Sequence, residues 1–162
     1  MGDEYYMGLA LQEAETALKE GNWPIGAVIV LDNNVISRSH NHSYTEDKLS
    51  HAEYIALKKV QDVLNENRRR AILYTTYEPC PMCFGAIMLS RIKRVVCGID
   101  LDNSGAMYLK ENAPLLFKQK FDVELVRGVL AKECSEVFLR SWQAKELLKK
   151  GLINLKELEE LL

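Results

Sequence analysis

The sequence predicts an α/β protein, a three-layer α/β/α sandwich around a five-stranded mixed sheet. Two observations lead to this prediction. Runs of β-branched residues, such as residues 25–31, are typical of strands that are buried on both faces. A strand, helix, strand order over residues 71–99 favours two parallel strands joined by a right-handed crossover.

The N-terminal part is expected to hold one helix and a β-hairpin. A helix over residues 4–20 has one apolar face and ends at Gly21. Strands over residues 25–31 and 35–39 are joined by a tight polar turn, which predicts antiparallel pairing.

The middle of the chain alternates helices and strands around a polar loop. Residues 40–50 are long for a connection, so we interpret them as a functional loop. A helix capped by Ser50 follows and ends at the polar run 65–70. A strand over residues 71–75 leads into a second helix over residues 80–90.

The C-terminal part is expected to complete the sheet and its helical cover. The elements are a strand over 94–99, a loop over 100–105, a short helix over 106–113, a strand over 121–127, one long amphipathic helix over 130–150 and a helical extension over 151–162.

The composition is that of one globular domain spanning residues 1–162. Hydrophobic residues make up 48% and charged residues 27%, which is ordinary for a folded domain. No apolar run approaches the ~20 residues of a membrane helix, and the acidic N-terminus does not resemble a signal peptide. Four cysteines, two of them in one motif, favour a reducing cytoplasm over a disulfide framework. The net charge of −2 gives no broad basic footprint and favours a small-molecule substrate.

Two short motifs carry the side chains that suit zinc chemistry. His51 and Glu53 stand two positions apart in the first motif, and Cys80 and Cys83 stand three apart in the second. A structural zinc site usually has four protein ligands, whereas a catalytic site keeps one position open for water. Three ligands beside a free carboxylate therefore predict hydrolytic chemistry with one Zn²⁺ per chain.

The spacing places these side chains at helix N-termini. Proline directly after Cys80 suits the first position of a helix, so Cys80 becomes the cap and Cys83 lies one turn further along the same face. The positive end of that helix stabilises both thiolates. Within a helix, His51 and Glu53 would point about 200° apart, so they share a pocket only if Ser50 caps a helix at this point.

Each motif also has a simpler interpretation. Ser50-x-x-Glu53 is also a capping box, in which the glutamate only binds the amide of the cap. Cys80-x-x-Cys83 could be a redox pair. A closed structural zinc site is a further alternative, with a fourth ligand from His40, His42, Cys97 or Cys134. The joint occurrence of both motifs, in this order, favours the catalytic site.

At this point the chain resembles the cytidine-deaminase superfamily, on the branch of the bacterial tRNA adenosine deaminases, guanine deaminases and fungal cytosine deaminase. The resemblance covers roughly residues 5–145. It is carried by Trp23-Pro24-Ile25-Gly26-Ala27, Asn41, His51-Ala52-Glu53, residues 73–86, Ser90-Arg91-Ile92, Arg94-Val95-Val96 and residues 128–134.

The resemblance implies a metal site and a proton shuttle. It implies that His51, Cys80 and Cys83 bind Zn²⁺ and that Glu53 moves protons between water and substrate. It also implies a homodimer.

The resemblance further implies a substrate pocket. Asn41 would hydrogen-bond the base or sugar, and Ile25 and the Ala52 backbone would line the pocket. From the residues alone, a loop-forming asparagine is the simpler interpretation of Asn41. Helical phase puts Trp142 on the inward side of the long helix, where an aromatic residue of the resembling families lies near the base; a core tryptophan is the alternative.

The sequence departs from the tRNA-editing pattern in three places. Leu49-Ser50 stands where Pro-Thr is usual, Asn103 stands where a lysine is usual, and residues 156–160 are largely acidic. These changes leave little positive charge where an anticodon stem would need phosphate contacts. The basic clusters at 68–70 and 91–94 are interpreted as solvated helix termini.

Three functions are therefore ranked. A zinc-dependent hydrolytic deaminase of a free base or nucleoside comes first. A tRNA-specific adenosine deaminase that makes inosine at the wobble position is the alternative. A non-catalytic structural zinc protein is a distant third.

Overall fold

The computed structural model describes residues 1–100, 105, 112 and 122–153. Apart from residue 112, the predicted helix over 106–113 therefore lies outside the described residues, as do the C-terminal extension beyond residue 153 and most of the loop after residue 100. The described elements are α1 (Asp3–Lys19), β1 (Gly26–Leu31), β2 (Asn34–His40), α2 (Ala52–Lys59), α3 (Gln61–Glu66), β3 (Ile72–Tyr77), α4 (Pro81–Leu89), β4 (Arg94–Ile99), β5 (Glu124–Val126), α7 (Ala131–Leu139) and α8 (Trp142–Lys149).

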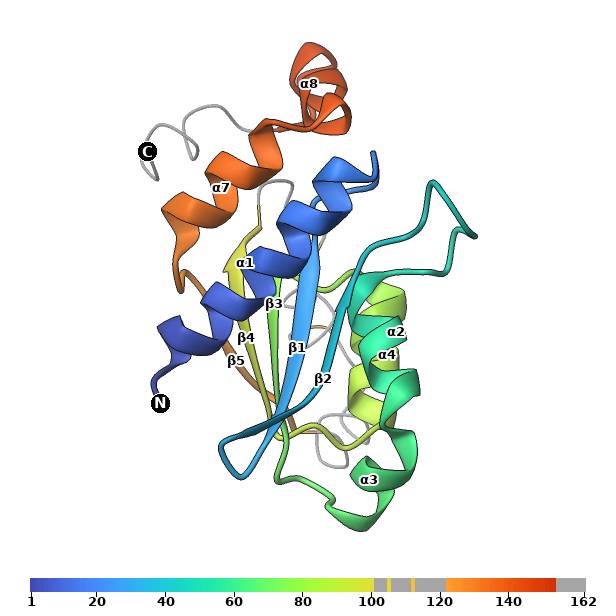
Figure 1. Cartoon of the computed structure of the whole chain (residues 1–162), viewed down its shortest axis with the longest axis vertical. Helices are drawn as coiled ribbons and strands as arrows, with labels where there is room; N and C mark the ends of the chain where they lie inside the picture. The colour runs from blue at the N-terminus through green and yellow to red at the C-terminus, as the bar shows by residue number, and fades with distance from the viewer. Residues whose placement is uncertain (101–104, 106–111, 113–121, 154–162) are drawn as a thin grey trace.

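The five strands form one mixed sheet in the order β2-β1-β3-β4-β5. β1 pairs antiparallel with β2 and with β3, whereas β3, β4 and β5 run parallel. Both the predicted hairpin and the predicted parallel β-α-β unit are thus confirmed. In Figure 1, α1 crosses the near face of the sheet and α7 lies next to α1, while α2 and α4 lie beside each other.

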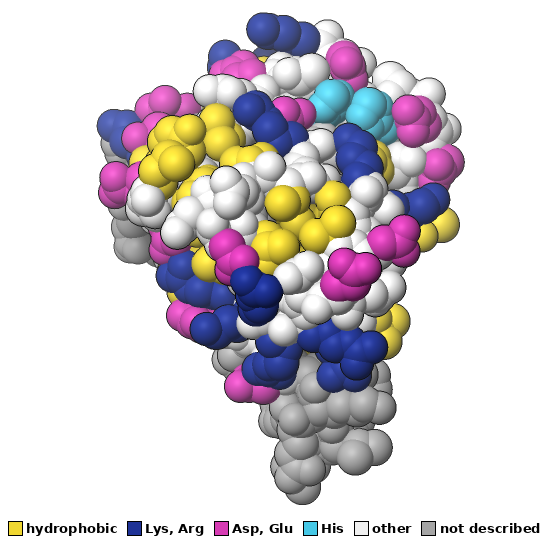
Figure 2. Space-filling view, turned by 60° about the horizontal axis from the view of Figure 1, so that its bottom comes forward, with side chains coloured by type: hydrophobic (Ala, Val, Ile, Leu, Met, Phe, Trp, Pro, Cys, Tyr) yellow, Lys and Arg dark blue, Asp and Glu magenta, His cyan; other side chains and the backbone are white. Residues whose placement is uncertain are grey.

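Positive and negative side chains both occur on the face that Figure 2 shows, where Lys and Arg side chains lie among Asp and Glu and hydrophobic groups of the described residues. Several of the described cations are paired: Arg70 with Asp32, and Arg94 with Asp3 and Glu124.

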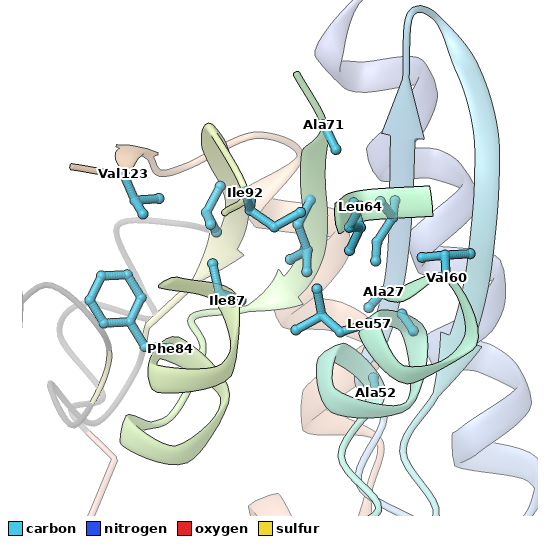
Figure 3. Packing of buried hydrophobic residues seen from close by; sticks show 14 residues of the cluster. Ala27, Ala52, Leu57, Val60, Leu64, Ala71, Phe84, Ile87, Ile92 and Val123 are labelled. Atoms are coloured by element: carbon cyan, nitrogen blue, oxygen red, sulfur yellow. The ribbon is translucent and has the colours of Figure 1, made fainter. Parts of the chain in front are cut away.

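The sheet is buried on both faces, as its β-branched strands require. Alternate residues of a strand point to opposite faces, so Ile29 faces the α2 and α4 layer whereas Val28 faces the α1 and α7 layer. Figure 3 shows the first of these cores, in which Leu57 and Ile87 fill the space between helices and strands. Burying each such side chain contributes about 1.5–3 kcal/mol. The first core thus holds α2 and α4 on one face of the sheet, and the second holds α1 and α7 on the other.

Gly26 allows α1 to pack directly on the backbone of β1. A Cβ atom at this position would overlap the carbonyl oxygen of Ala10 and lie 2.6 Å from the amide nitrogen of Ala14. The Gly26 amide donates to Oγ1 of Thr76 at 3.1 Å. The close approach of helix and strand therefore depends on the missing side chain.

The predicted long helix over residues 130–150 is wrong, because the chain forms α7 and α8 with a break at Ser141. The Ser141 hydroxyl donates to the Phe138 carbonyl at 2.8 Å and accepts from the Ala144 amide at 3.1 Å. A serine that satisfies free backbone groups in this way starts a new helix and competes with continuation of the old one. The helix predicted after Ser50 is likewise divided, at Val60, into α2 and α3.

Candidate metal centre and active site

Cys80 and Cys83 occupy the N-terminus of α4. Cys80 is the cap residue with extended backbone angles (φ −66°, ψ 167°), and Pro81 takes the first helical position. Cys83 follows one turn later and is fully buried. Here the local structure is the one that the Cys-Pro-x-Cys sequence predicts.

His51, not Ser50, is the cap residue of α2. His51 has extended backbone angles (φ −79°, ψ 148°), and the helix starts at Ala52. Ser50 was expected to cap the helix, but its hydroxyl donates to Oδ2 of Asp47 at 2.8 Å. The loop acid thus withdraws Ser50 from the helix end, and the imidazole is free to project from the first turn.

Three potential metal ligands converge between the two helix ends. Nδ1 of His51 lies 3.5 Å from Sγ of Cys80 and 3.6 Å from Sγ of Cys83. In a tetrahedral zinc site, a sulfur at about 2.3 Å and a nitrogen at about 2.0–2.1 Å from the ion lie about 3.6 Å apart. The donors therefore fit Zn²⁺ in both chemistry and spacing.

None of the four residues considered as a fourth ligand joins this group. Cys97 donates to the Val126 carbonyl at 3.5 Å, and Cys134 packs in the core against α1. His40 and His42 stack on each other in a different cluster. Among the described residues, the group consists of His51, Cys80 and Cys83 alone, which leaves a coordination position for a non-protein ligand.

Glu53 is buried beside the three ligands, with 3% of its surface exposed. Its Oε2 accepts from Sγ of Cys83 at 3.6 Å, and its Oε1 lies 3.4 Å from Oγ1 of Thr75. The capping-box interpretation is wrong, because the Ser50 amide that Glu53 would have bound donates to the Asp47 carbonyl at 3.0 Å. The carboxylate is therefore available for proton transfer.

The electrostatics of the metal-free site follow from burial and from shared protons. Burial raises the pKa of the Glu53 carboxyl. Hydrogen bonds from Cys83 and then from His51 lower the pKa of the Cys80 thiol to about 4. The bond to Cys80 and burial raise the pKa of Cys83, and hydrogen bonding to Cys80 raises that of His51. The site holds a thiolate that attracts a cation, and cation binding would displace the remaining thiol proton.

A pocket opens directly above these groups. Its apolar wall is aromatic: Trp23 stacks on Phe138 with ring centroids 5.7 Å apart, and Tyr77 contacts Phe138 at 4.8 Å. A flat apolar wall opposite a few polar groups suits a planar heterocycle. The lining residues are Trp23, Ile25, Asn41, His51, Glu53, Tyr77, Glu78, Cys80, Phe138 and Leu147.

Most residues that the sequence singled out meet at this pocket. Ile25 and Asn41 line it, whereas Ala52 is buried and is not one of the lining residues. Oδ1 of Asn41 accepts from the amide and hydroxyl of Ser43 at 2.9 and 2.8 Å. Asn41 thus shapes the loop through its oxygen and presents its amide nitrogen as the group available to a ligand.

Trp142 is not brought into the pocket. It lies at the start of α8, is 53% exposed and packs edge-on against Tyr44 with ring centroids 5.3 Å apart. Its predicted inward orientation assumed one continuous helix, and the break at Ser141 changes the helical phase. Leu147 is the α8 residue that lines the pocket.

Sequence reasoning missed several lining residues. Trp23, Tyr77 and Glu78 lie in segments that carried the family resemblance, so a signal for them was present. Phe138 and Leu147 come from α7 and α8, and only the packing of these helices over the sheet brings them to the site.

Fold and site together define a zinc deaminase. A family model described as "Cytidine and deoxycytidylate deaminase zinc-binding region" matches residues 1–99, and the chain belongs to this family. It is a zinc-dependent hydrolytic deaminase that acts on C–N bonds. Within the described residues, no helix is long and apolar enough to cross a membrane.

Relatives that match over nearly their whole length carry the name tRNA-specific adenosine deaminase. The chain is 39% identical over 162 residues to the tRNA-specific adenosine deaminase of Bacillus subtilis (strain 168), covering 98% of both chains. It is 38% identical to the enzyme of the same name from Haemophilus influenzae, covering 94% of this chain and 91% of the relative.

Similar solved structures include both a tRNA:A34 deaminase study and a guanine deaminase. One comes from a study of A-to-I editing by tRNA:A34 deaminases at the wobble position and is 34% identical, with a TM-score of 0.73. The match covers 82% of this chain and 98% of the chain in that structure. The guanine deaminase from Bacillus subtilis is 33% identical with a TM-score of 0.58, covering 70% of this chain and 79% of its own.

Proposed function

We propose that this protein converts adenosine to inosine at the wobble position of tRNA. The observation that carries the proposal is the 39% identity to a tRNA-specific adenosine deaminase over 98% of both chains. This reverses the ranking from sequence patterns, in which a free base or nucleoside came first. That ranking relied on three departures from the tRNA-editing pattern, at Leu49-Ser50, at residue 103 and at residues 156–160, and the last two lie outside the described residues.

In this proposal His51, Cys80 and Cys83 hold the zinc ion. When bound, Zn²⁺ activates water for attack on the carbon that carries the amino group. The two helix N-termini that present the ligands add positive potential, which favours the thiolates. The spacing of 3.5 and 3.6 Å between the imidazole nitrogen and the two sulfurs supports this ligand set.

Glu53 moves the protons of the reaction. It accepts one proton from the attacking water and passes it to the adjacent ring nitrogen of adenine. It then takes the second proton from the hydroxyl group newly bound to the ring carbon and gives it to the leaving amine. Adenosine and water thus give inosine and ammonia. Burial raises the pKa of this carboxyl toward the range in which it can both accept and donate a proton.

The pocket holds the adenine in place. The ring would lie against the wall formed by Trp23, Tyr77 and Phe138, because aromatic stacking accepts any planar base. Asn41 would donate a hydrogen bond from its amide nitrogen. Beyond the pocket, Tyr44 and Trp142 expose aromatic surface, and Nζ of Lys48 lies 4.5 Å from the Tyr44 ring centroid. This combination suits unpaired nucleotides that flank the target base.

The charge pattern predicts a modest electrostatic contribution to tRNA binding. Arg70 and Arg94 are paired with carboxylates, and both signs of charge are interspersed on the face in Figure 2. Each phosphate contact adds about 0.7–0.9 to the slope of log K against log salt concentration. We expect a shallow slope, with specificity coming from recognition of the target base in the pocket.

A substrate comparison tests the proposal. The enzyme is given a tRNA transcript with adenosine at position 34, the same transcript with guanosine there, and free adenosine, adenine, guanine and cytosine. Inosine is read by sequencing and ammonia by a coupled assay. We expect inosine only at position 34 of the first transcript, with Glu53→Gln as the inactive control. Ammonia from a free base or nucleoside, without tRNA editing, would restore the first-ranked small-molecule function.

The expected homodimer stays a prediction. Light scattering coupled to gel filtration checks it directly, since the dimer would have twice the 18.5 kDa mass of the chain.

A further inference from the structure

A second cluster of metal-binding side chains lies outside the zinc centre. One ligand atom each from Glu20, His40 and His42 lies within 4.8 Å of the others. The three residues come from the C-terminal cap of α1, the last position of β2 and the loop that follows. The zinc centre at His51 belongs to a separate group of ligands.

The hydrogen bonds of His40 resemble those of a metal ligand. Its Nε2 lies 3.1 Å from Oε2 of Glu20, close to the ~3.3 Å that separates two ligands each about 2.0–2.1 Å from a tetrahedral ion. Its Nδ1 lies 3.1 Å from Oε2 of Glu13. A carboxylate at the second ring nitrogen fixes the tautomer and orientation of metal-bound histidines. Glu13 is itself held by Arg38 at 2.8 Å.

His42 also has a carboxylate near one of its ring nitrogens. Its Nδ1 lies 3.5 Å from Oε1 of Glu46, which leaves its other ring nitrogen for an ion. Its ring centroid is 4.3 Å from that of His40. Both imidazoles are largely covered, so they are held near each other and do not move freely in solvent.

The backbone that carries the two histidines is fixed by hydrogen bonds. The His42 amide donates to the Ser50 carbonyl at 2.8 Å, and the Asn41 amide donates to the Ile25 carbonyl at 3.0 Å. A site on such a backbone is preorganised, so little ordering entropy opposes ion binding.

We propose that Glu20, His40 and His42 form a second metal site, for a divalent transition-metal ion such as Zn²⁺. Two imidazoles and one carboxylate favour this class of ion over Mg²⁺ or Ca²⁺, which prefer oxygen ligands. The site does not depend on the proposed tRNA substrate. Because Asn41 lies between the two histidines and lines the substrate pocket, ion binding would also brace this pocket residue.

Zn²⁺ titration of the zinc-loaded enzyme tests the proposal. We expect calorimetry to show a second equivalent per chain in the wild type, bound at least tenfold more weakly in Glu20→Gln and in His42→Asn. Both variants should keep the first equivalent. Glu15→Gln changes another acid of α1, which pairs with Arg140, and is the matched control that should keep both.

Imidazole NMR identifies the residues that bind. The chain has only three histidines, so each ring can be followed. The signals of His40 and His42 should shift with the second equivalent, while that of His51 stays in place. Three results would overturn the proposal: only one equivalent of Zn²⁺ in the wild type, a second equivalent that binds only at millimolar Zn²⁺, or a second equivalent that persists in both variants. The cluster would then consist of ion pairs alone.

Discussion

Nδ1 of His51 lies 3.5 Å from Sγ of Cys80, although 29 positions separate the two residues in the sequence. The contact joins the N-caps of α2 and α4. The packing of these two helices in the hydrophobic core sets the distance between the two side chains. An ion held here would crosslink two helices that the hydrophobic core has already aligned.

Removing either sulfur should remove the metal. We expect Cys80→Ala and Cys83→Ala to lose most of the bound zinc, because two remaining ligands hold the ion weakly. Elemental analysis of the purified variants measures this. Cys134→Ala, a buried cysteine outside the site, is the control and should keep one zinc per chain. Full zinc retention in both ligand variants would contradict the assignment.

Glu53→Gln should separate catalysis from stability. Loss of the proton shuttle is expected to reduce kcat about 10²–10⁴-fold while zinc is retained. Burial raises the pKa of Glu53, so the ionised carboxylate costs stability above its unfolded pKa. The neutral glutamine should therefore be at least as stable in urea denaturation of the metal-free protein. Turnover within tenfold of wild type would remove Glu53 from the mechanism.

The ion pair between Asp3 and Arg94 should give a pH-dependent stability. Arg94 donates two hydrogen bonds of 2.8 Å to Asp3, and Tyr74 donates a third of 2.9 Å. The bond from Arg94 is the main cause that lowers the pKa of Asp3. A lowered carboxyl pKa contributes stability above the unfolded value, near 3.9, and this stability is lost as pH falls through the folded value.

We therefore expect Asp3→Asn to lower the free energy of unfolding by about 1 kcal/mol at pH 7. The difference from wild type should shrink below about pH 4. Urea denaturation at both pH values measures it, with the exposed neighbour Glu4→Gln as control. A difference that does not change with pH would indicate packing and not charge.

Ser141→Ala should destabilise α8. The variant loses the oxygen that accepts from the Ala144 amide at 3.1 Å, and loss of an N-cap costs about 1 kcal/mol. Thermal and urea denaturation measure the change, and Ser141→Thr, which keeps a capping hydroxyl, should recover most of it. If threonine and alanine behave alike, the hydroxyl has no role in holding the helix.

The role of Trp142 in substrate choice stays a prediction, but the expected contact is now with a nucleotide outside the pocket. Its exposed ring could stack on a nucleotide next to the target base, which is worth about 1–3 kcal/mol per base. We expect Trp142→Ala to raise KM for tRNA with little change in kcat. Leu152→Ala, also exposed on this part of the chain, is the control. An unchanged KM would limit Trp142 to its contact with Tyr44.

The features that could be predicted from sequence are those with a local or periodic cause. Runs such as residues 25–31 identify buried strands, and proline after Cys80 identifies the helix end that presents both thiols. The capping roles of Ser50 and Ser141 could not be predicted, because they depend on which hydrogen-bond partner each hydroxyl takes. Those partners, a backbone carbonyl or an acidic side chain, are set by the folded chain. Phe138 reaches the pocket through packing, which no short pattern encodes.

The comparisons favour the tRNA alternative over the small-molecule substrate that the sequence patterns ranked first. That ranking weighed Leu49-Ser50 and a few charges near residue 103 and at the C-terminus, whereas the likeness to tRNA-specific adenosine deaminases extends over the whole chain. A few surface charges change readily between relatives, so they are weaker evidence than the full length of the chain.

Gly26 couples the helix layer to the width of the active-site pocket. Since even one methyl group there would collide with the backbone of α1, any replacement must push the helix outward or pull the strand inward. Ile25, the preceding residue, forms part of the pocket wall, so either movement would be felt by the substrate. The position is thus expected to reject any residue larger than glycine, although Gly26 is not one of the residues that line the pocket, and variants designed to reshape the pocket should leave it unchanged.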